Sequence, residues 1–499
     1  MVHLNGSLPE TVAAVDLGST SFHLIVARPH SDQLVVVDRL REMVQLASGL
    51  DSSRRLSQEA RDRALACLRR FGERVGHLPR ERVRAVGTNT LRSAKNARRF
   101  LTEARSALGH YIETISGMEE ARLIFLGVTQ SLPDPGLRRL VLDIGGGSTE
   151  LIVGEAMQPI LMESLYLGCV TLSRRYFEDG EITQGRWRKA ELAALQEMEP
   201  FQGRYRKAGW EQAVGASGTV RAVDAVVRSQ EWSKEGITMK SLKRLRDAML
   251  KSGRVNGLEG ISPERVPVFP GGVVLLLAAF EALGIETMQT SEGALREGLL
   301  HDLLGRIGDK DVRTRSVSSL ADRFHVDREQ ASRVERTAMG FLSQMEAPWD
   351  LGSRGCGQLL SWAALLHEIG LDIAHQQYHK HGEYIIAQAD LPGFSRDEQR
   401  MLALLVRAHR RRFPESLLKG LPPPWSDTAE RLAILLRLAV ALHRSRGPDP
   451  LPDLSLQVEE TKIRLRLPEG WLDERPLTRA DLDSEASLLA DAGYALEIA

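Results

Sequence analysis

Two stretches of the chain repeat one pattern of apolar and polar positions. Residues 13–26 read AAVDLGSTSFHLIV and residues 140–153 read LVLDIGGGSTELIV, and the two align without a gap. Each is an apolar run that ends in an Asp, a loop of small residues and a second apolar run, which predicts a strand, a tight turn and a strand. The repeat therefore predicts two related domains that each contribute one such turn.

The segments after each repeat alternate between strand and helix patterns. Apolar residues recur with helical spacing over 58–75, and strand-like runs occur at 34–40 and 82–87. Strands first, then alternating helix and strand, are typical of an α/β layer fold. We therefore predict an α/β protein with one domain over residues 11–124 and a second over 125–308.

The pattern changes after the polar segment 308–311, which predicts a linker. Nearly continuous helical spacing follows and predicts an all-α domain over residues 312–446. Beyond a Pro-Asp-Pro break, apolar and polar residues alternate strictly over 454–467, which predicts a hairpin. A small α+β domain over residues 450–499 is expected to close the chain.

Composition narrows the class of protein. Of 499 residues, 42% are hydrophobic and 26% are charged, as in ordinary globular domains. The 66 basic residues balance the 66 acidic ones, so we expect no nucleic-acid coat function and no nucleic-acid partner. Three widely spaced cysteines favour a reducing compartment. Without a signal-peptide pattern at the start, the expected location is cytoplasmic, with peripheral attachment to the inner membrane as an alternative.

The small residues of the two turns point to phosphate binding. Turns without bulky side chains let backbone N–H groups approach an anion closely. Asp16 and Asp143 each end an apolar strand, where a bound Mg²⁺ or the N–H groups of the turn would stabilise a carboxylate. The predicted phosphate clamp consists of Asp16, Gly18, Ser19, Ser21, Gly145, Gly146, Gly147 and Ser148.

One position distinguishes the two copies. Glu150 in the second copy stands where the first copy has His23. Asp143 and Glu150 are therefore expected on adjacent antiparallel strands, where they could share a metal ion or position water. The second copy is the half that we expect to hold the metal.

Two further loops follow predicted strands and carry hydroxyl groups. Residues 87–92 read GTNTLR and residues 215–219 read GASGT. Such hydroxyl groups, together with an arginine as a forked donor, can bind phosphate, although each loop alone could be an ordinary helix entry. The phosphate-site residues predicted in these loops are Thr88, Thr90, Arg92, Gly215, Ser217, Gly218 and Thr219.

The segment 116–122, SGMEEAR, predicts a helix start. Ser116 and Glu119 fit a capping box, which gives Glu119 a structural role. Glu120 has no such role, and the helix N-terminus favours its ionised form. An ionised carboxylate beside a phosphate site can accept a proton from water, so we predict Glu120 as a general base; the alternative is a surface glutamate.

Further basic residues are candidates for binding a long anion. Arg296 lies between two glycines and either lines the cleft or ends a helix. The basic run 407–412 is typical of a solvated surface, but in a protein with a phosphate clamp it could hold an anionic chain. The residues predicted to contact such a chain are Arg296, Arg407, His409, Arg410 and Arg411.

Together these motifs resemble the exopolyphosphatase/guanosine pentaphosphate phosphatase family of the actin–sugar kinase–Hsp70 superfamily. The match rests on AAVDLGSTSFHLIVAR, VGTNTLR, ISGMEEARLIFLGV, VLDIGGGSTELIVGE, LGCV, VGASGTV, SEGALREGLL and LLHEIGL, in that order. The resemblance implies two ribonuclease-H-like domains with the active site between them, then an HD-like helical domain. His367-Glu368 departs from the His-Asp of HD-type metal phosphohydrolases, and we expect this domain to bind substrate and form a homodimer.

The resemblance also implies a reaction. It makes Glu120 the general base for water and places Asp143 and Glu150, with Glu120 beside them, around Mg²⁺; K⁺ is a further candidate cofactor. The motifs VGTNTLR and DIGGGSTE look more like the exopolyphosphatase branch, in its long bacterial form. We therefore predict hydrolysis of inorganic polyphosphate to orthophosphate.

Three alternatives to this reaction stay open. One is hydrolysis of guanosine pentaphosphate, with guanosine penta- and tetraphosphate as ligands. More distant ones are an ATP-dependent kinase of the same superfamily and a non-catalytic polyphosphate-binding protein. The predicted acids and Glu120 favour hydrolysis over both of these.

Overall fold

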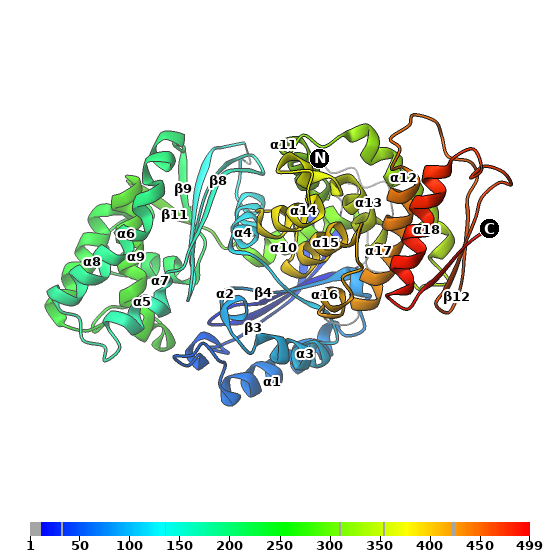
Figure 1. Ribbon diagram of the computed structural model, residues 1–499. Helices are drawn as coiled ribbons and strands as arrows, with labels where there is room; N and C mark the ends of the chain where they lie inside the picture. Colours follow the sequence, from blue (N-terminus) through cyan, green and yellow to red (C-terminus); the bar gives the residue numbers. More distant parts are fainter. Residues whose placement is uncertain (1–10, 31–32, 135, 309–310, 353–354, 422–424) are drawn as a thin grey trace. The chain divides into compact units, whose positions relative to one another are not determined.

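The computed structural model describes residues 11–30, 33–134, 136–308, 311–352, 355–421 and 425–499 (Figure 1). The chain divides into two compact units, Met1–Asp311 and Val312–Ala499, and each is described here by itself. The division falls at the predicted linker 308–311, of which 309–310 lie outside the described residues.

The first repeat begins a sheet with the strand order β3-β2-β1-β4-β5. Strand β1 pairs antiparallel with β2 and parallel with β4. The strands are β1 (Val12–Leu17), β2 (Phe22–His30), β3 (Gln33–Glu42), β4 (Val83–Gly87) and β5 (Ile112–Thr114). Helices α1 (Gln58–Val75) and α3 (Ala97–Leu108) cover one face of this sheet, and the short helix α2 (Asn89–Ser93) occupies the predicted loop after β4.

The second repeat begins a sheet with the order β10-β11-β9-β6-β7-β8. Read from β8, its first five strands follow the order of the first sheet, so the duplication seen in the sequence extends to the topology. The strands are β6 (Arg139–Ile144), β7 (Thr149–Glu155), β8 (Gln158–Leu165), β9 (Gln212–Gly215), β10 (Ile237–Thr238) and β11 (Thr287–Thr290). The predicted α/β class is confirmed.

Helices fill the rest of this second lobe (Figure 1). They are α5 (Cys169–Tyr176), α6 (Gln184–Ala208), α7 (Gly218–Ser229), α8 (Met239–Ser252), the 3-10 helix η3 (Pro263–Val268) and α9 (Phe269–Leu283). By length and composition Pro263–Leu283 could cross a membrane, but 78% of its most apolar window is buried in the protein. The burial of this window identifies α9 as the core helix of the lobe.

Two helices, α4 (Gly117–Ser131) and α10 (Leu295–Ile307), pack between the two sheets and share one core with both. Helix α4 follows the first sheet in sequence but packs on β7 and β8, whereas α10 follows the second sheet and packs on β1 and β2. This exchange explains why the predicted domains 11–124 and 125–308 form one compact unit.

Glycines allow these two helices to touch through their backbones. A Cβ added to Gly298 would lie 1.8 Å from the Leu123 carbonyl oxygen, and one added to Gly127 would lie 1.9 Å from the Ala294 carbonyl oxygen. No side chain fits at either position unless the helices move apart.

Buried ion pairs hold the same crossing. Arg122 of α4 donates to Glu119 (Nε–Oε2, 2.7 Å) and also bonds to Asp302 of α10. Asp302 also pairs with Arg84 of β4 and with Arg306. Burial alone would raise the pKa of Asp302, but these three guanidinium groups hold it well below its usual range.

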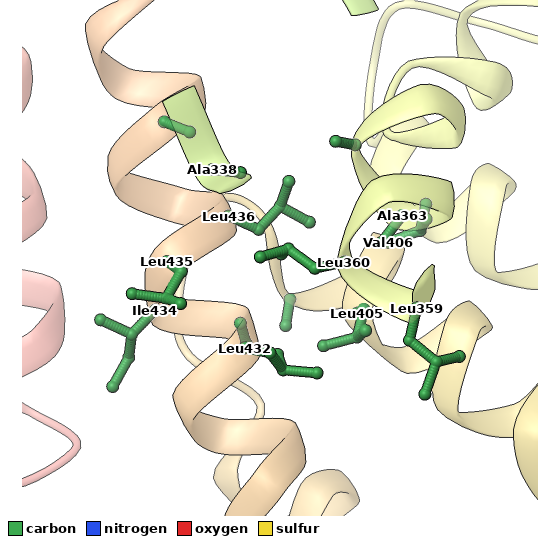
Figure 2. Close-up of a cluster of buried hydrophobic side chains, with 14 of the residues drawn as sticks. Ala338, Leu359, Leu360, Ala363, Leu405, Val406, Leu432, Ile434, Leu435 and Leu436 are labelled. Carbon is green, nitrogen blue, oxygen red and sulfur yellow. The ribbon is translucent and has the colours of Figure 1, made fainter. Parts of the chain in front are cut away.

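The second unit has one core shared by helices and a small sheet. Figure 2 shows part of it, where Leu360, Leu405 and Leu436 come together from three helices. The C-terminal residues Leu456 and Leu482 belong to the same core, so the structure packs the predicted segments 312–446 and 450–499 together.

The elements of the second unit are as follows. Its helices are α11 (Val312–Arg323), α12 (Arg328–Met345), α13 (Cys356–Leu366), η4 (Ile369–Asp372), α14 (Tyr378–Gln388), α15 (Arg396–Ala408), α16 (Glu415–Lys419), α17 (Trp425–Leu442) and α18 (Pro476–Ala490). Its strands are β12 (Ser455–Glu459), β13 (Lys462–Arg466) and β14 (Ala495–Ile498), and β12 and β13 form the predicted hairpin.

The helix crossing predicts that Gly298→Ala is destabilising. The added methyl group meets backbone on α4, so the substitution should lower the free energy of unfolding by about 1–3 kcal/mol. The matched control is Gly203→Ala in α6, where a Cβ meets nothing within 4 Å and should be neutral or slightly stabilising. Calorimetry of both variants checks this, and equal melting temperatures would contradict the close crossing.

Candidate active site

A cavity of about 760 Å³ lies within the first unit, and both repeated turns line it. The turns touch each other, since a Cβ added to Gly146 would lie 2.9 Å from Thr20 Oγ1 and 3.2 Å from Ser19 Cβ. Both turns therefore face one space. The predicted phosphate-clamp and loop residues in its lining are Asp16, Gly18, Ser19, Ser21, Thr88, Gly145, Gly146, Ser148, Ser217, Gly218 and Thr219.

Other predicted site residues fall into two groups. Glu120, Asp143 and Arg296 also line the cavity. Those behind the lining are Thr90, Arg92, Gly147, Glu150 and Gly215. Thr90, for example, donates from Oγ1 to the Ser19 Oγ at 2.8 Å, so it positions the first turn from behind.

The strand pairs of the two repeats have the same register next to the cavity. Asp16 pairs with His23 across β1 and β2, and Asp143 pairs with Glu150 across β6 and β7. The carboxylates of both strand ends therefore point from equivalent positions into the shared space. This is the arrangement that the aligned repeat predicted for Asp143 and Glu150.

Burial governs the protonation of these acids. It raises the pKa of Asp16 to about 7, against the opposing charge of Arg296. Burial and the neighbouring Glu120 raise the pKa of Asp143 to about 7 as well. Burial, Glu120 and Asp143 together raise the pKa of Glu150 well above its usual value. Burial in this site thus favours protonated carboxyl groups.

Glu120 is a carboxylate that faces the cavity from the first turn of α4. Ser116 caps α4 as predicted, because its Oγ accepts from the Glu119 N–H at 3.1 Å. The Glu119 carboxylate joins the buried ion pairs with Arg122, whereas Glu120 faces the cavity. Burial raises the pKa of Glu120 and the charge of Arg92 opposes this. A higher pKa makes a carboxylate a better proton acceptor.

Arg92 holds this glutamate in place. Its Nη1 donates to Glu120 Oε2 at 3.1 Å and to the Ile115 carbonyl at 2.9 Å. Its Nη2 is buried and has no hydrogen-bond partner among the described residues. Arg92 therefore orients Glu120 through its Nη1 atom. Its Nη2 atom is the one that could make the predicted contact with phosphate.

His23 links the first turn to α10. Arg296 Nη1 lies 2.9 Å from His23 Nδ1, and Ser21 Oγ lies 2.7 Å from His23 Nε2. A guanidinium can only donate, so Nδ1 accepts and the ring proton sits on Nε2, which donates to Ser21. Burial and Arg296 lower the pKa of His23 to about 3, which keeps the ring neutral. The hydroxyl proton of Ser21 thus remains available for a phosphate oxygen.

In the second copy, Glu150 accepts hydrogen bonds from serine hydroxyl groups, whereas His23 in the first copy donates one. Ser164 Oγ donates to Glu150 Oε1 at 2.9 Å, and the Ser148 side chain also hydrogen-bonds to this carboxylate. The hydroxyl proton of Ser148 is thereby directed to Glu150, whereas that of Ser21 is free. The two copies of the turn therefore offer different donors to a ligand.

Sequence reasoning missed three basic side chains near these turns. Arg221 and Arg265 line the cavity, and His23 was noted only for replacing Glu150. The available signals were weak: Arg221 follows the GASGT loop within one helical turn, and His23 is the polar residue of an apolar strand. No local pattern marks Arg265.

Comparison with known proteins identifies the family. The sequence pattern of the Ppx/GppA phosphatase family matches residues 25–307, and that of Ppx/GppA phosphatase domain III matches residues 312–486. The chain belongs to the Ppx/GppA phosphatase family. The predicted resemblance is confirmed, and so is the broader prediction of a hydrolase.

Relatives of known name or structure agree with this membership. A protein of Aeromonas hydrophila named guanosine-5'-triphosphate,3'-diphosphate pyrophosphatase is 41% identical over 484 residues, 97% of each chain. The Aquifex aeolicus PPX-GPPA enzyme is 25% identical, with a TM-score of 0.50 over 58% of this chain and 98% of that one. An exopolyphosphatase from Cytophaga hutchinsonii, 23% identical, shares the fold, with a TM-score of 0.54 over 59% of this chain and 98% of that one.

The acids of this Ppx/GppA member fit a divalent cation that is held partly through water or phosphate. Among the described residues, no three His, Cys, Asp or Glu side chains are grouped closely enough to hold a metal ion by themselves, so the metal-binding role of Asp143, Glu150 and Glu120 stays a prediction. Asp16 Oδ1, however, is buried without a hydrogen-bond partner in the described part of the chain. Mg²⁺ typically binds through one or two carboxylates plus waters and phosphates, which Asp16 and Asp143 could supply.

The basic run of the second unit is only partly exposed. His409 is buried, with Nδ1 2.5 Å from a backbone carbonyl, so its ring does not contribute to a solvent-facing anion surface. Arg407 lies 3.4 Å from a glutamate, and the Arg410 guanidinium lies 4.4 Å from the centre of a tyrosine ring. Arg411 is exposed. A binding surface for a long anion there would rest on the arginines alone.

The role of His23 predicts a specific pattern of variants. His23→Leu removes both hydrogen bonds and should raise KM for the phosphorylated substrate about tenfold, the worth of one buried polar contact. His23→Gln should restore most of the loss, because a carboxamide also offers one acceptor and one donor. Steady-state kinetics with both variants test this, and equal KM values for Leu and Gln would refute the hydrogen-bond relay.

The raised pKa of Asp143 predicts a pH-dependent stability. The raised pKa keeps a proton on Asp143 of the folded protein up to about pH 7, whereas the unfolded carboxyl loses it near its ordinary pKa of 3.8. Stability of the ligand-free protein should therefore fall as the pH rises from about 4 to 7. Asp143→Asn should raise the free energy of unfolding by on the order of 1–2 kcal/mol at about pH 8, since the cavity partly hydrates the carboxylate, and should change little at about pH 4. Calorimetry at both pH values measures the difference, and a gain independent of pH would argue against the shift.

Proposed function

We propose that this protein hydrolyses the terminal 5'-phosphate of guanosine 5'-triphosphate 3'-diphosphate to give guanosine tetraphosphate and orthophosphate. The name of the Aeromonas hydrophila relative, 41% identical over nearly the whole chain, supports this substrate. It favours guanosine pentaphosphate, the alternative that the sequence left open, over the main prediction of polyphosphate.

The observation that carries the proposal is the position of Glu120. It lines the same cavity as both phosphate turns and is oriented by Arg92 at 3.1 Å. Water that enters between Glu120 and a terminal phosphate gives its proton to the carboxylate as its oxygen bonds to phosphorus. The bond between that phosphorus and the bridging oxygen breaks, and the diphosphate end of the nucleotide leaves.

The turns supply the charge stabilisation. Backbone N–H groups of both turns and the free hydroxyl of Ser21 can donate to the phosphoryl oxygens, which carry the charge in the transition state. Asp16 and Asp143 would hold Mg²⁺, which would neutralise phosphate charge when bound. K⁺ as a second cation, a homodimer and a cytoplasmic location stay predictions.

Inorganic polyphosphate is the second candidate substrate. The motifs VGTNTLR and DIGGGSTE favour it, as they resemble the exopolyphosphatase branch. Both substrates end in a phosphoanhydride, so the same base and turns would serve either reaction.

A substrate panel with one variant tests the proposal. We expect a higher kcat/KM for phosphate release from guanosine pentaphosphate than from long polyphosphate, in the presence of Mg²⁺. Glu120→Gln keeps the shape of the side chain but removes the base, so kcat should fall by about 100- to 10,000-fold while binding persists. The matched control is Glu103→Gln on α3, outside the cavity.

The panel distinguishes the two substrates and tests the role of Glu120. A preference for polyphosphate would replace the proposed substrate by the second candidate. Undiminished turnover in Glu120→Gln would remove Glu120 from the role of base. Loss of activity in Glu103→Gln as well would indicate a general effect of the substitutions.

A further inference from the structure

Two arginines from one run of chain hold the two consecutive glutamates at the start of α4. Arg84 lies in β4, and Arg92 lies in α2, which begins one residue after β4 ends. Arg84 Nη2 lies 3.6 Å from Glu119 Oε1, and Arg92 Nη1 lies 3.1 Å from Glu120 Oε2. The first turn of α4 is therefore tied to β4 and its continuation through both glutamates.

Asp302 of α10 binds both of the arginines that reach Glu119. Arg122 of α4 donates to Glu119 from Nε (2.7 Å) and from Nη2 (2.8 Å), and its Nη2 also bonds to Asp302 Oδ1. Arg84 bonds to Asp302 Oδ2. All four side chains are buried. The carboxylate of Asp302 thus holds two guanidinium groups in the positions from which they contact Glu119.

These side chains belong to a buried ion-pair cluster in which charge is balanced. It contains three arginines and three carboxylates, namely Arg84, Glu113, Glu119, Arg122, Asp302 and Arg306. Because a buried charge is costly without a partner, loss of one carboxylate forces the remaining groups to rearrange. Without Asp302, Arg84 and Arg122 would compete for Glu119 and would displace it.

A displacement of Glu119 is transmitted to Glu120 through the helix. The two residues are neighbours in the first turn of α4, where the Glu120 N–H donates to the Ser116 carbonyl at 3.0 Å. A movement of this turn therefore shifts Glu120 relative to Arg92 and to the cavity. A general base must lie within hydrogen-bond reach of the proton that it accepts, and a misplacement of about 1 Å can cost about 100-fold in rate.

We propose that Asp302 is a positioning residue, which holds Glu119 through Arg84 and Arg122 and thereby sets the position of Glu120. Asp302 does not line the cavity, so it acts on the placement of the base and not by contact with a substrate. The inference rests on the proposed role of Glu120 as base, whichever of the two phosphorylated substrates the protein hydrolyses.

Two neutral variants of the ion-pair cluster separate positioning from stability. Asp302→Asn removes the carboxylate that holds both arginines. Glu113→Gln is the matched control, because Glu113 pairs with Arg84 (3.2 Å) and Arg306 (3.9 Å) and, within the described chain, has no ion pair with α4. Both variants leave a buried positive charge without its partner, so both should lower the melting temperature.

Kinetics should distinguish the two variants. With guanosine pentaphosphate and with long polyphosphate as substrates, we expect Asp302→Asn to lower kcat by about tenfold to 100-fold, with little change in KM. Glu113→Gln should keep the kcat of the wild type. Loss of the Arg92 contact also raises the pKa of Glu120, since the charge of Arg92 opposes the effect of burial. The acidic limb of the kcat–pH profile should therefore move to higher pH in Asp302→Asn alone.

Crystal structures of the two variants measure the position of Glu120 without turnover. In Asp302→Asn, Glu120 Oε2 should lie beyond hydrogen-bond distance from Arg92 Nη1, whereas Glu113→Gln should keep the contact at about 3.1 Å. This measurement applies even if neither guanosine pentaphosphate nor polyphosphate is hydrolysed. Failure of the proposed function is thus distinguished from failure of the positioning role.

Two results would overturn the positioning role of Asp302. One is a folded Asp302→Asn variant that keeps the contact between Glu120 and Arg92. The other is an equal loss of kcat in Asp302→Asn and Glu113→Gln, which would assign the effect to stability. If Asp302→Asn does not fold, Glu119→Gln replaces it with the same expected results, because its amide oxygen still accepts from Arg122 but no longer pairs with Arg84 as a charge.

Discussion

The close crossing of α4 and α10 is the contact on which the site depends. Gly127 and Gly298 bring the two backbones together, so the helices fit in one relative position. Arg122 and Asp302 then fix their rotation, because buried charges are tolerated only when they are paired. Glu120 follows Glu119 directly on α4, so the ion pairs that hold Glu119 also set the direction of Glu120. The proposed base is therefore oriented by contacts that lie away from the cavity.

The packing around α4 and α10 also gives the two repeats different side-chain partners. Helix α10 brings Arg296 to His23 at 2.9 Å, whereas strand β8 brings Ser164 to Glu150 at 2.9 Å. One copy of the turn therefore frees a hydroxyl donor and the other directs its hydroxyl to a carboxylate. The first turn can thus donate a hydroxyl proton to a phosphate, whereas the hydroxyl of the second turn is held by a carboxylate behind the lining. The two repeats share one backbone arrangement. His23 and Glu150, at the aligned position, give the two turns different hydrogen-bonding properties.

Features that depend on neighbours in sequence could be predicted, and features that depend on distant contacts could not. The helix 58–75, the hairpin near the C-terminus and the paired turns follow from local periodicity and glycine content. The position of Glu120 in the first turn of a helix could be predicted because a capping serine is a local signal. The exchange of α4 and α10 joins residues more than 150 positions apart, so no local pattern reveals it. His23, Arg221 and Arg265 were missed because their roles follow from what lies opposite them in space.

Buried charge of both signs lines this cavity, and that constrains its ligand. Asp16 and Asp143 have pKa values raised by burial to about 7, which a nearby cation would lower. Arg221 and Arg265 have lowered pKa values, which an anion would raise. A ligand with several linked phosphates and a bound cation supplies charge of both signs at once, so the electrostatics of the cavity favour a polyphosphorylated substrate over a simple phosphomonoester.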